Sequence, residues 1–142
     1  MPIYRCLSPR GLLTRSMKAE IADAITAIHT EATGAPEVYV NVLFHEIDDG
    51  DCFVAGKPST RSYLFGLIRH GRALETRQTM LRQFTRMWVG ITGQSEAELL
   101  LALGEVDPAN AMEAGLILPE PGQEQRWLAT NRARLTEPGL ML

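Results

Sequence analysis

Short apolar runs alternate along the chain with longer segments in which apolar residues recur every three or four positions. The first run, residues 3–7, predicts a buried strand that begins almost at the N-terminus and is broken by the Ser-Pro-Arg-Gly sequence at 8–11. A helix is expected from Thr14 or Ser16 to about Thr33, because Gly34 with Pro36 just beyond it is typical of a helix end. The buried stripe of this helix consists of Met17, Ile21, Ala24, Ile25 and Ile28.

A second strand and a second strand-helix-strand unit follow. Residues 38–47 are rich in β-branched and aromatic side chains and predict a strand, and the polar segment 48–60 predicts a loop with a short hairpin around 52–54. Residues 63–68 predict a third strand, and residues 69–72 lead into a helix that ends at Gly93. Residues 99–103 predict a buried fourth strand. Within the second helix, Met80, Met87 and Trp88 are expected in the core or in a contact between subunits.

The order strand-helix-strand thus occurs twice, offset by about sixty residues, which is typical of duplicated βαβ units with parallel flanking strands. We expect an α/β (α+β) fold, a four-stranded sheet with both helices on one face, in a single domain over residues 1–142. Its pseudo-repeats span about 2–47 and 61–105. The tail adds a short helical turn at 109–114, a Pro/Gly-rich stretch at 118–122 and a final helix near 124–134. The second sheet face still needs cover, which favours oligomerisation.

Composition narrows the function classes. A net charge of -3 argues against a nucleic-acid binder, which normally carries a basic face. Cys6 and Cys52 form no metal-binding pattern and are typical of reduced, cytoplasmic thiols. The N-terminus lacks the apolar region of a signal peptide, and no apolar run is long enough for a membrane span.

A proline directly after Met1, at the start of a strand in a duplicated βαβ chain, carries a resemblance to a known family. The segments that share it are PIY (2–4), AITAIH (24–29), GLIRHGR (66–72), GE (104–105), MEAG (112–115) and LPEPGQEQRW (118–127). In this order and spacing the chain resembles the tautomerase superfamily, and within it the cis-3-chloroacrylic acid dehalogenase-like branch.

The resemblance implies a cofactor-independent homotrimeric enzyme that acts on a small carboxylate. It also implies the site residues, which are the catalytic Pro2, exposed when Met1 is removed, then His29, Arg69, Arg72 and Glu113.

One residue departs from the family pattern. The alignment on Gly104 and Glu105 places Ala102 where the family has a tyrosine that helps to activate water, which puts dehalogenation in doubt.

The chemistry of these residue types fits the resemblance. An N-terminal proline is a secondary amine, and an ordinary α-amino group titrates near ~8. Neighbouring guanidinium groups or an apolar pocket lower that pKa, so that the amine becomes a general base, or a nucleophile toward a carbonyl. Arg69 and Arg72 together suit a carboxylate, which guanidinium groups bind in a bidentate manner.

Each of these residues also has a structural interpretation. The two arginines can be solvated turn residues, His29 can be a packed residue at a helix end, and Glu113 can be a solvated helix residue. The acidic segment 45–51 fits neither a calcium loop nor an HExxH motif, so we expect no metal and no cofactor.

Three functions are compatible with these residues. The first is a tautomerase or isomerase of a small 2-oxo or enol carboxylic acid, with Pro2 as base, Arg69 and Arg72 as carboxylate ligands and His29 as a further polar contact. The second is a hydratase or dehalogenase of 3-substituted acrylates, with Pro2 as acid and Glu113 activating water. The third is a non-catalytic trimeric binding or signalling protein on the same scaffold.

Overall fold

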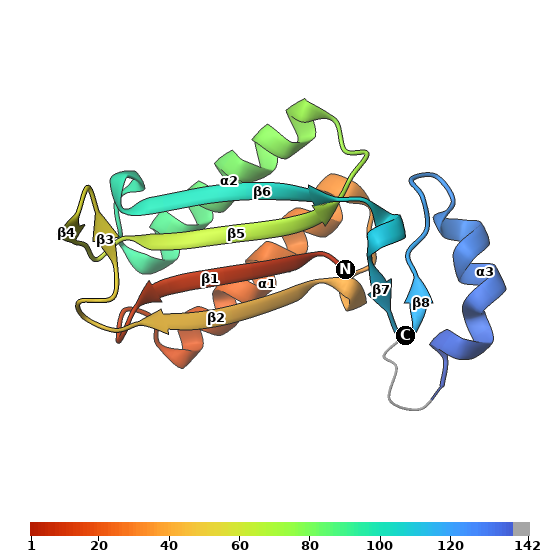
Figure 1. The fold of residues 1–142 in the computed structure, drawn as a ribbon, viewed down its shortest axis with the longest axis horizontal. Coiled ribbons are helices and arrows are strands. Elements are labelled where there is room, and N and C mark those ends of the chain that lie inside the picture. Colours follow the sequence, from red (N-terminus) through yellow and green to blue (C-terminus); the bar gives the residue numbers. More distant parts are fainter. Residues whose placement is uncertain (138–142) are drawn as a thin grey trace.

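The computed structural model describes residues 1–137, and the last five residues of the expected domain 1–142 lie outside them. Its centre is a four-stranded sheet in the order β2-β1-β5-β6 (Figure 1). The strands are β1 (Ile3–Pro9), β2 (Asn41–Ile47), β5 (Ser62–Arg69) and β6 (Leu99–Val106). β1 pairs with β2 and β5 with β6 in parallel, whereas the two central strands are antiparallel. Both expected parallel pairs are therefore confirmed.

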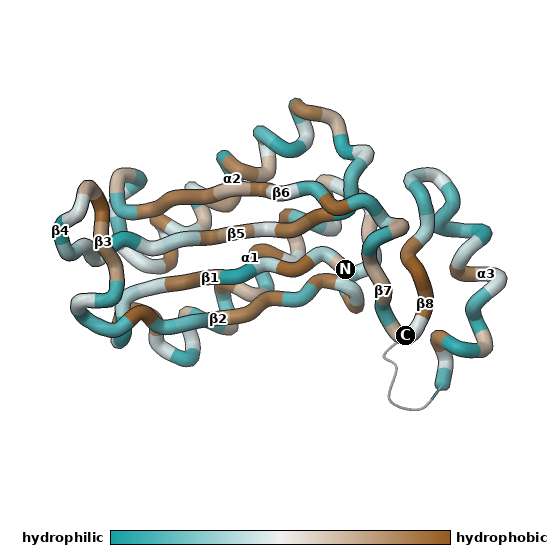
Figure 2. The backbone as a smooth tube through the Cα atoms, in the orientation of Figure 1, coloured by the Kyte–Doolittle hydropathy of each residue, from teal (hydrophilic) through white to brown (hydrophobic). Residues whose placement is uncertain are grey.

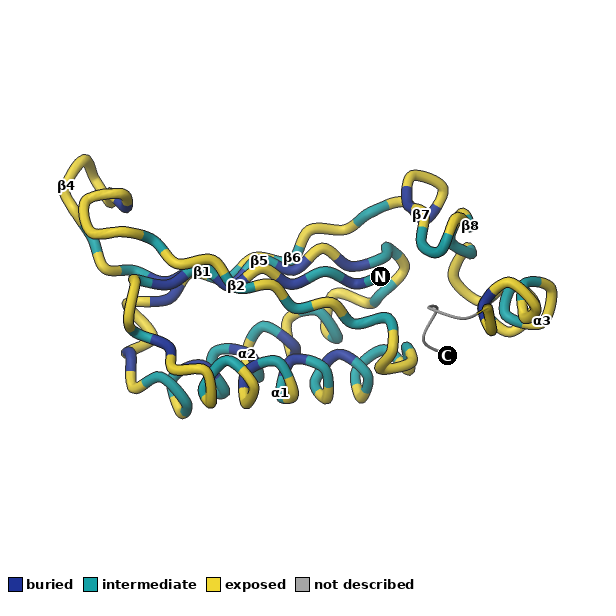
Figure 3. The backbone as a smooth tube through the Cα atoms, turned by 90° about the horizontal axis from the view of Figure 1, so that it is seen from below, coloured by how far each residue is buried: buried dark blue, intermediate teal, exposed yellow. Residues whose placement is uncertain are grey.

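Two long helices cover one face of this sheet. α1 (Arg15–Thr33) begins after Thr14, whose hydroxyl accepts a hydrogen bond from the backbone N–H of Met17 at 3.1 Å. α2 (Leu74–Thr92) ends, like α1, at a glycine with positive φ, 71° at Gly34 and 76° at Gly93. Figure 3 shows both helices on the same side of the sheet, as the sequence predicts; on the opposite side, β4 and β7 rise only at the two ends, and no element of residues 1–137 lies across the face.

The core lies between the helices and the sheet. Each helix buries three residues spaced four apart, which places them on one stripe. They are Ile21, Ile25 and His29 in α1, and Met80, Phe84 and Trp88 in α2. These side chains pack against Tyr4, Cys6, Leu64 and Ile68 of the central strands. Met80 and Trp88 are thus core residues, as expected.

The other face of the sheet carries apolar side chains that no described element covers. Leu43, Leu67 and Leu100 on this face are 47%, 39% and 40% exposed. Figure 2 shows hydrophobic positions recurring along all four strands. Exposed apolar side chains gathered on one face are typical of a contact with another chain.

One predicted strand begins later than expected. Residues 37–39 form a 3-10 turn, η1 (Glu37–Tyr39), in place of the start of the 38–47 strand. The N–H of Tyr39 donates to Pro36 O at 3.2 Å, and that of Val40 to Glu37 O at 2.9 Å. Because these donors are used within the turn, the ladder with β1 begins only at Asn41.

The prediction of a helical turn at 109–114 is wrong. A 3-10 turn, η3 (Pro108–Asn110), gives way to a hairpin of β7 (Met112–Glu113) and β8 (Leu116–Ile117). Ala114 and Gly115 both have positive φ, 53° and 76°, which is the backbone that a two-residue hairpin turn requires. Glu113 therefore lies on a strand of this hairpin and not on a helix.

The remaining elements complete the two ends of the molecule. The expected hairpin near residue 53 is present as β3 (Phe53–Val54) and β4 (Lys57–Pro58), and η2 (Glu96–Glu98) precedes β6. The final helix is α3 (Glu124–Leu135), close to its predicted range. Figure 1 places β7, β8 and α3 at the end of the sheet where the chain begins. No helix within residues 1–137 is both long and apolar enough to cross a membrane.

Candidate active site

The antiparallel pairing of the two central strands brings the start of the chain beside the end of β5. Ile3 pairs with Leu67, so the N-terminus lies next to Arg69 at the last position of that strand. Residues far apart in the sequence thereby come together at one edge of the sheet.

A pocket of about 470 Å³ opens at this edge. Met1, Arg69, Arg72 and Glu113 line it on the side of the sheet and the β7–β8 hairpin. The segment after α1 lines a second side, and the tail with the start of α3 lines a third. Three of the five predicted site residues therefore meet in one cavity.

The N-terminal amine faces Glu113 in this pocket. The amino group of Met1 forms an ion pair with Glu113 Oε2. Pro2 is fully buried directly behind Met1, and its carbonyl oxygen accepts hydrogen bonds from the N–H and Nδ2 of Asn41 at 3.1 and 3.3 Å. Removal of Met1 would leave the Pro2 nitrogen as the terminal amine at the wall of this pocket.

Arg69 is held by the C-terminal tail. Its Nη1 donates to Pro119 O at 2.8 Å, and its Nη2 to Glu124 Oε1 at 2.5 Å. Burial alone would raise the pKa of Glu124, but backbone hydrogen bonds and the Arg69 guanidinium outweigh it and lower that pKa below its ordinary value. Arg69 thus has a carboxylate partner already.

Arg72 has none. It lines the same pocket, and it forms no ion pair with any residue between 1 and 137. Its pKa is lowered by burial and then by the charge of Arg69, although Glu124 partly opposes this. An arginine remains protonated even so, and among residues 1–137 Arg72 is therefore the pocket cation without an ion pair, which suits it to an anionic ligand.

His29 is brought close to these residues but does not line the pocket. It is 3% exposed, and its Nδ1 lies 2.7 Å from the Tyr4 hydroxyl. Burial, and then the positive charges of Arg72 and the N-terminus, lower the pKa of His29 to about 4. The imidazole is therefore neutral near pH 7. The substrate contact expected for it stays a prediction.

Tyr39 is a pocket residue that the sequence did not predict. Its hydroxyl is buried and has no hydrogen-bond partner among the described residues, although Tyr39 lines the cavity. No local signal marks it, because residue 39 lies in a β-rich segment that predicts an ordinary strand. Ala102, by contrast, lies on the open sheet face opposite Phe65 and does not line the pocket.

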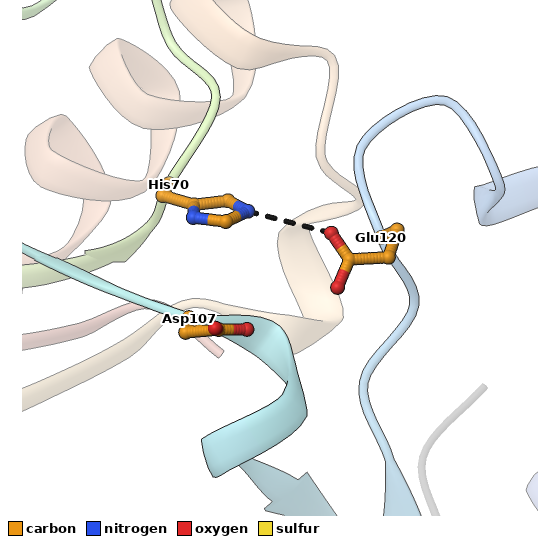
Figure 4. Close-up of side chains that lie close together, drawn as sticks. All are labelled: His70, Asp107 and Glu120. Atoms are coloured by element: carbon orange, nitrogen blue, oxygen red, sulfur yellow. Dashed lines mark hydrogen bonds and ion pairs between the residues drawn. The ribbon is translucent and has the colours of Figure 1, made fainter.

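A second group of polar side chains fastens the tail just outside the pocket. His70, Asp107 and Glu120 offer ligand-type atoms within 4.8 Å of one another (Figure 4). His70 Nε2 lies 3.4 Å from Glu120 Oε2, and Asp107 Oδ1 accepts the N–H of Ala109 at 2.9 Å. The His70–Glu120 contact ties the tail to the residue after β5, and Asp107 caps the turn after β6, so these contacts already account for the arrangement.

Comparison with known proteins agrees with this geometry. The family model described as "Putative oxalocrotonate tautomerase enzyme" matches residues 1–132. The crystal structure of native Ps01740 is 37% identical, covers 78% of this chain and 99% of that chain, and superposes with a TM-score of 0.77. The structure of N1, a member of the cis-3-chloroacrylic acid dehalogenase family, is 30% identical over 90% of this chain and 91% of that one, with a TM-score of 0.85.

A fused 4-OT, solved as a symmetric trimer, shares the fold at 16% identity, over 82% of this chain and 94% of that one, with a TM-score of 0.75. None of the curated proteins matches the chain. The fold and the matched family place the chain in the tautomerase superfamily. Within it, the chain belongs to the cis-3-chloroacrylic acid dehalogenase-like branch.

Proposed function

We propose that the protein is a cofactor-independent tautomerase that interconverts the enol and keto forms of a small 2-oxo carboxylic acid, with Pro2 as the general base. The observation that carries this proposal is the amino group of Met1, one residue before Pro2, beside Glu113 in a pocket of about 470 Å³ that Arg72 also lines. This supports a site in which the amine of Pro2, freed by the removal of Met1, meets a small acid held by Arg72.

The reaction needs only a proton transfer. The Pro2 nitrogen removes the proton of the enol hydroxyl, the C=O bond forms as the C=C bond moves its electrons to C3, and the ammonium returns the proton to C3. A positioned base of this kind contributes roughly 10²- to 10⁴-fold to the rate when its pKa is near the working pH.

The other residues bind and orient the acid. Arg72 takes the carboxylate first, because it has no other ion pair among residues 1–137, and Arg69 joins it when Glu124 yields one of its contacts. Glu113, which pairs with the amino group of Met1 in this structure, orients the proton of the Pro2 nitrogen after Met1 is removed. His29 acts as a neutral group that fixes Tyr4 beneath the N-terminus and reaches the substrate once Met1 is absent.

The hydration of a 3-substituted acrylate is the second candidate, and the position of Glu113 favours it. Its carboxylate lies in the pocket and next to the terminal amine. In that reaction Glu113 takes a proton from water, the hydroxide adds to C3, and protonated Pro2 delivers a proton to C2. A substrate with chlorine at C3 then releases chloride.

We further propose that three copies of the chain assemble and cover the open sheet faces. The exposed leucines on that face, together with the trimeric relative of the same fold, support this assembly. Sedimentation should give the mass of a trimer for the wild type. Leu100→Glu should reduce that mass, whereas Leu74→Glu, an exposed leucine on the helix side, should not.

The first experiment pairs the intact mass of the purified protein with phenylenolpyruvate ketonisation by the wild type and Pro2→Ala. We expect the loss of one methionine and a decrease in kcat of roughly 100-fold in the variant. Pro58→Ala, on the distant β3–β4 hairpin, is the control and should retain full activity.

A retained Met1 without turnover would refute the base mechanism and favour the non-catalytic binding protein. Turnover that does not depend on Pro2 would also refute the base mechanism. Chloride release from cis-3-chloroacrylate without ketonisation would favour the hydratase.

A further inference from the structure

The Tyr39 hydroxyl is a buried donor with no partner among the described residues, and it belongs to a residue that lines the pocket. Buried hydroxyl groups are nearly always hydrogen-bonded, so an unpartnered one on a residue that lines a cavity requires an explanation. A ligand in the pocket with an acceptor oxygen would supply the missing bond.

The backbone around Tyr39 is tied directly to the N-terminus. Asn41 Nδ2 donates to Tyr39 O at 2.9 Å and to Pro2 O at 3.3 Å, and the N–H of Asn41 also donates to Pro2 O. The N–H of Tyr39 is held by Pro36 O in the 3-10 turn. The backbone of Tyr39 is therefore fixed relative to that of Pro2, the proposed base, through Asn41.

The surroundings of the phenol keep its proton in place. Burial and then the negative charge of Glu113 raise the pKa of Tyr39 above its ordinary value. The group is thus a neutral O–H near pH 7, which donates a hydrogen bond and does not act as a base.

We propose that Tyr39 is a further catalytic residue, whose hydroxyl donates a hydrogen bond to the 2-oxo or enolate oxygen of the acid that Arg72 holds by its carboxylate. The inference rests on the proposed tautomerase function and names the group that recognises the second oxygen of its substrate. No bond to Tyr39 forms or breaks. As the enol proton leaves for Pro2, negative charge grows on that oxygen, and a preorganised donor stabilises it most strongly at that point.

The test is Tyr39→Phe, which removes one hydroxyl and keeps the ring. Tyr63→Phe is the matched control, because its hydroxyl contacts Cys52 Sγ at 3.4 Å at the opposite end of β5. Two readouts are compared: ketonisation kinetics, and the binding of 2-oxobutanoate and butanoate measured by calorimetry. The two acids differ only in the oxygen that Tyr39 recognises.

Tyr39→Phe should lower kcat roughly 10- to 100-fold. It should weaken 2-oxobutanoate binding about fivefold and leave butanoate binding unchanged, since a neutral hydrogen bond contributes about that factor. Tyr63→Phe should match the wild type in every measurement.

Equal loss of affinity for both acids, or none for either, would overturn the role of Tyr39 even if turnover depends on Pro2. Selective weakening of 2-oxobutanoate binding supports the role even if the wild type lacks turnover, in which case only the tautomerase proposal fails. A wild type that binds neither acid would overturn both.

Discussion

The two halves of the molecule share the order strand-helix-strand but have different residues at equivalent positions. α1 and α2 begin at residues 15 and 74 and end at residues 33 and 92, a shift of 59 at both ends. At this shift Arg10 corresponds to Arg69 and Leu13 to Arg72. Both pairs lie between the end of the first strand of a repeat and the start of its helix, with Arg69 as the last residue of β5.

The two connections lie at opposite ends of the sheet, because β1 and β5 are antiparallel. Arg10 is exposed and forms ion pairs with Glu46 and Asp48, so its charge is satisfied at the surface. Arg69 is mostly buried under the tail and paired with Glu124. The same residue type therefore has a surface role in one repeat and a pocket role in the other, and the tail makes the difference.

The second pair differs in chemistry. Leu13 is a core residue that is 6% exposed, whereas Arg72 puts a charged group at the equivalent position, in the wall of the pocket. Arg72 is half-buried and has no ion pair within the described part of the chain; such a group lowers stability and is typical of a binding site. At this position the second repeat therefore has a pocket residue where the first repeat has a core residue.

Replacing Arg72 by the residue of the first repeat tests this comparison most strongly. Arg72→Leu should lower kcat/KM for ketonisation roughly 10- to 100-fold, because hydrogen bonds to a charged carboxylate are lost. Its melting temperature should equal or exceed that of the wild type. Arg10→Leu should leave kcat/KM unchanged, and equal losses in the two variants would contradict the assignment.

The helices offer a second test, because His29 occupies the position that Trp88 occupies in α2. The pKa of buried His29 is about 4, against an ordinary value of 6.5, so the unfolded chain takes up a proton first as the pH falls. The stability from neutral His29 is complete above about pH 6.5 and is lost as the pH falls toward 4.

Urea unfolding between pH 7.5 and 4.5 measures this contribution, which amounts to at most about 1.4 kcal/mol per pH unit. His29→Gln should flatten the pH dependence by up to this slope. The exposed His45→Gln is the control and should keep the slope of the wild type. An unchanged slope in His29→Gln would mean that the imidazole is solvated in the folded protein.

The smallest expected effect concerns the helix starts. Thr14 caps α1 with its hydroxyl, whereas Ala73, at the equivalent position before α2, has no side-chain cap although its φ and ψ of -59° and 149° suit one. Ala73→Thr should stabilise the protein by about 1 kcal/mol, and Thr14→Ala should destabilise it by a similar amount. Urea unfolding curves check both; a destabilised Ala73→Thr would show that the second connection is shaped for the pocket and not for the helix.

Local patterns in the sequence were sufficient for most of the fold. Apolar spacing and the glycines at 34 and 93 predicted the two helices and their ends, and the repeated order of elements predicted two parallel strand pairs. In two places the local backbone conformation differed from the predicted element. Backbone donors used in the 3-10 turn delayed β2 to Asn41, and positive φ at Ala114 and Gly115 made a hairpin where a helical turn was expected.

The resemblance carried by short motifs placed Arg69, Arg72 and Glu113 in one site before any contact was known, and the pocket joins all three. Only the tertiary structure showed which of these side chains already have an ion-pair partner. Whether an arginine is paired depends on residues more than fifty positions away, such as Glu124 for Arg69, and no local pattern encodes that pairing.

The sequence by itself thus determined the elements, their order, the family and the residue types available for chemistry, because these follow from local periodicity and from motif spacing. The tertiary structure decided which groups among residues 1–137 remain unpartnered. It paired Arg69 with Glu124, left Arg72 without an ion pair, placed His29 against Tyr4, and buried the Tyr39 hydroxyl without a partner on a residue that lines the pocket. The physical reason is that burial and pairing are properties of the packed chain, in which residues distant in sequence share one dielectric environment and compete for the same partners.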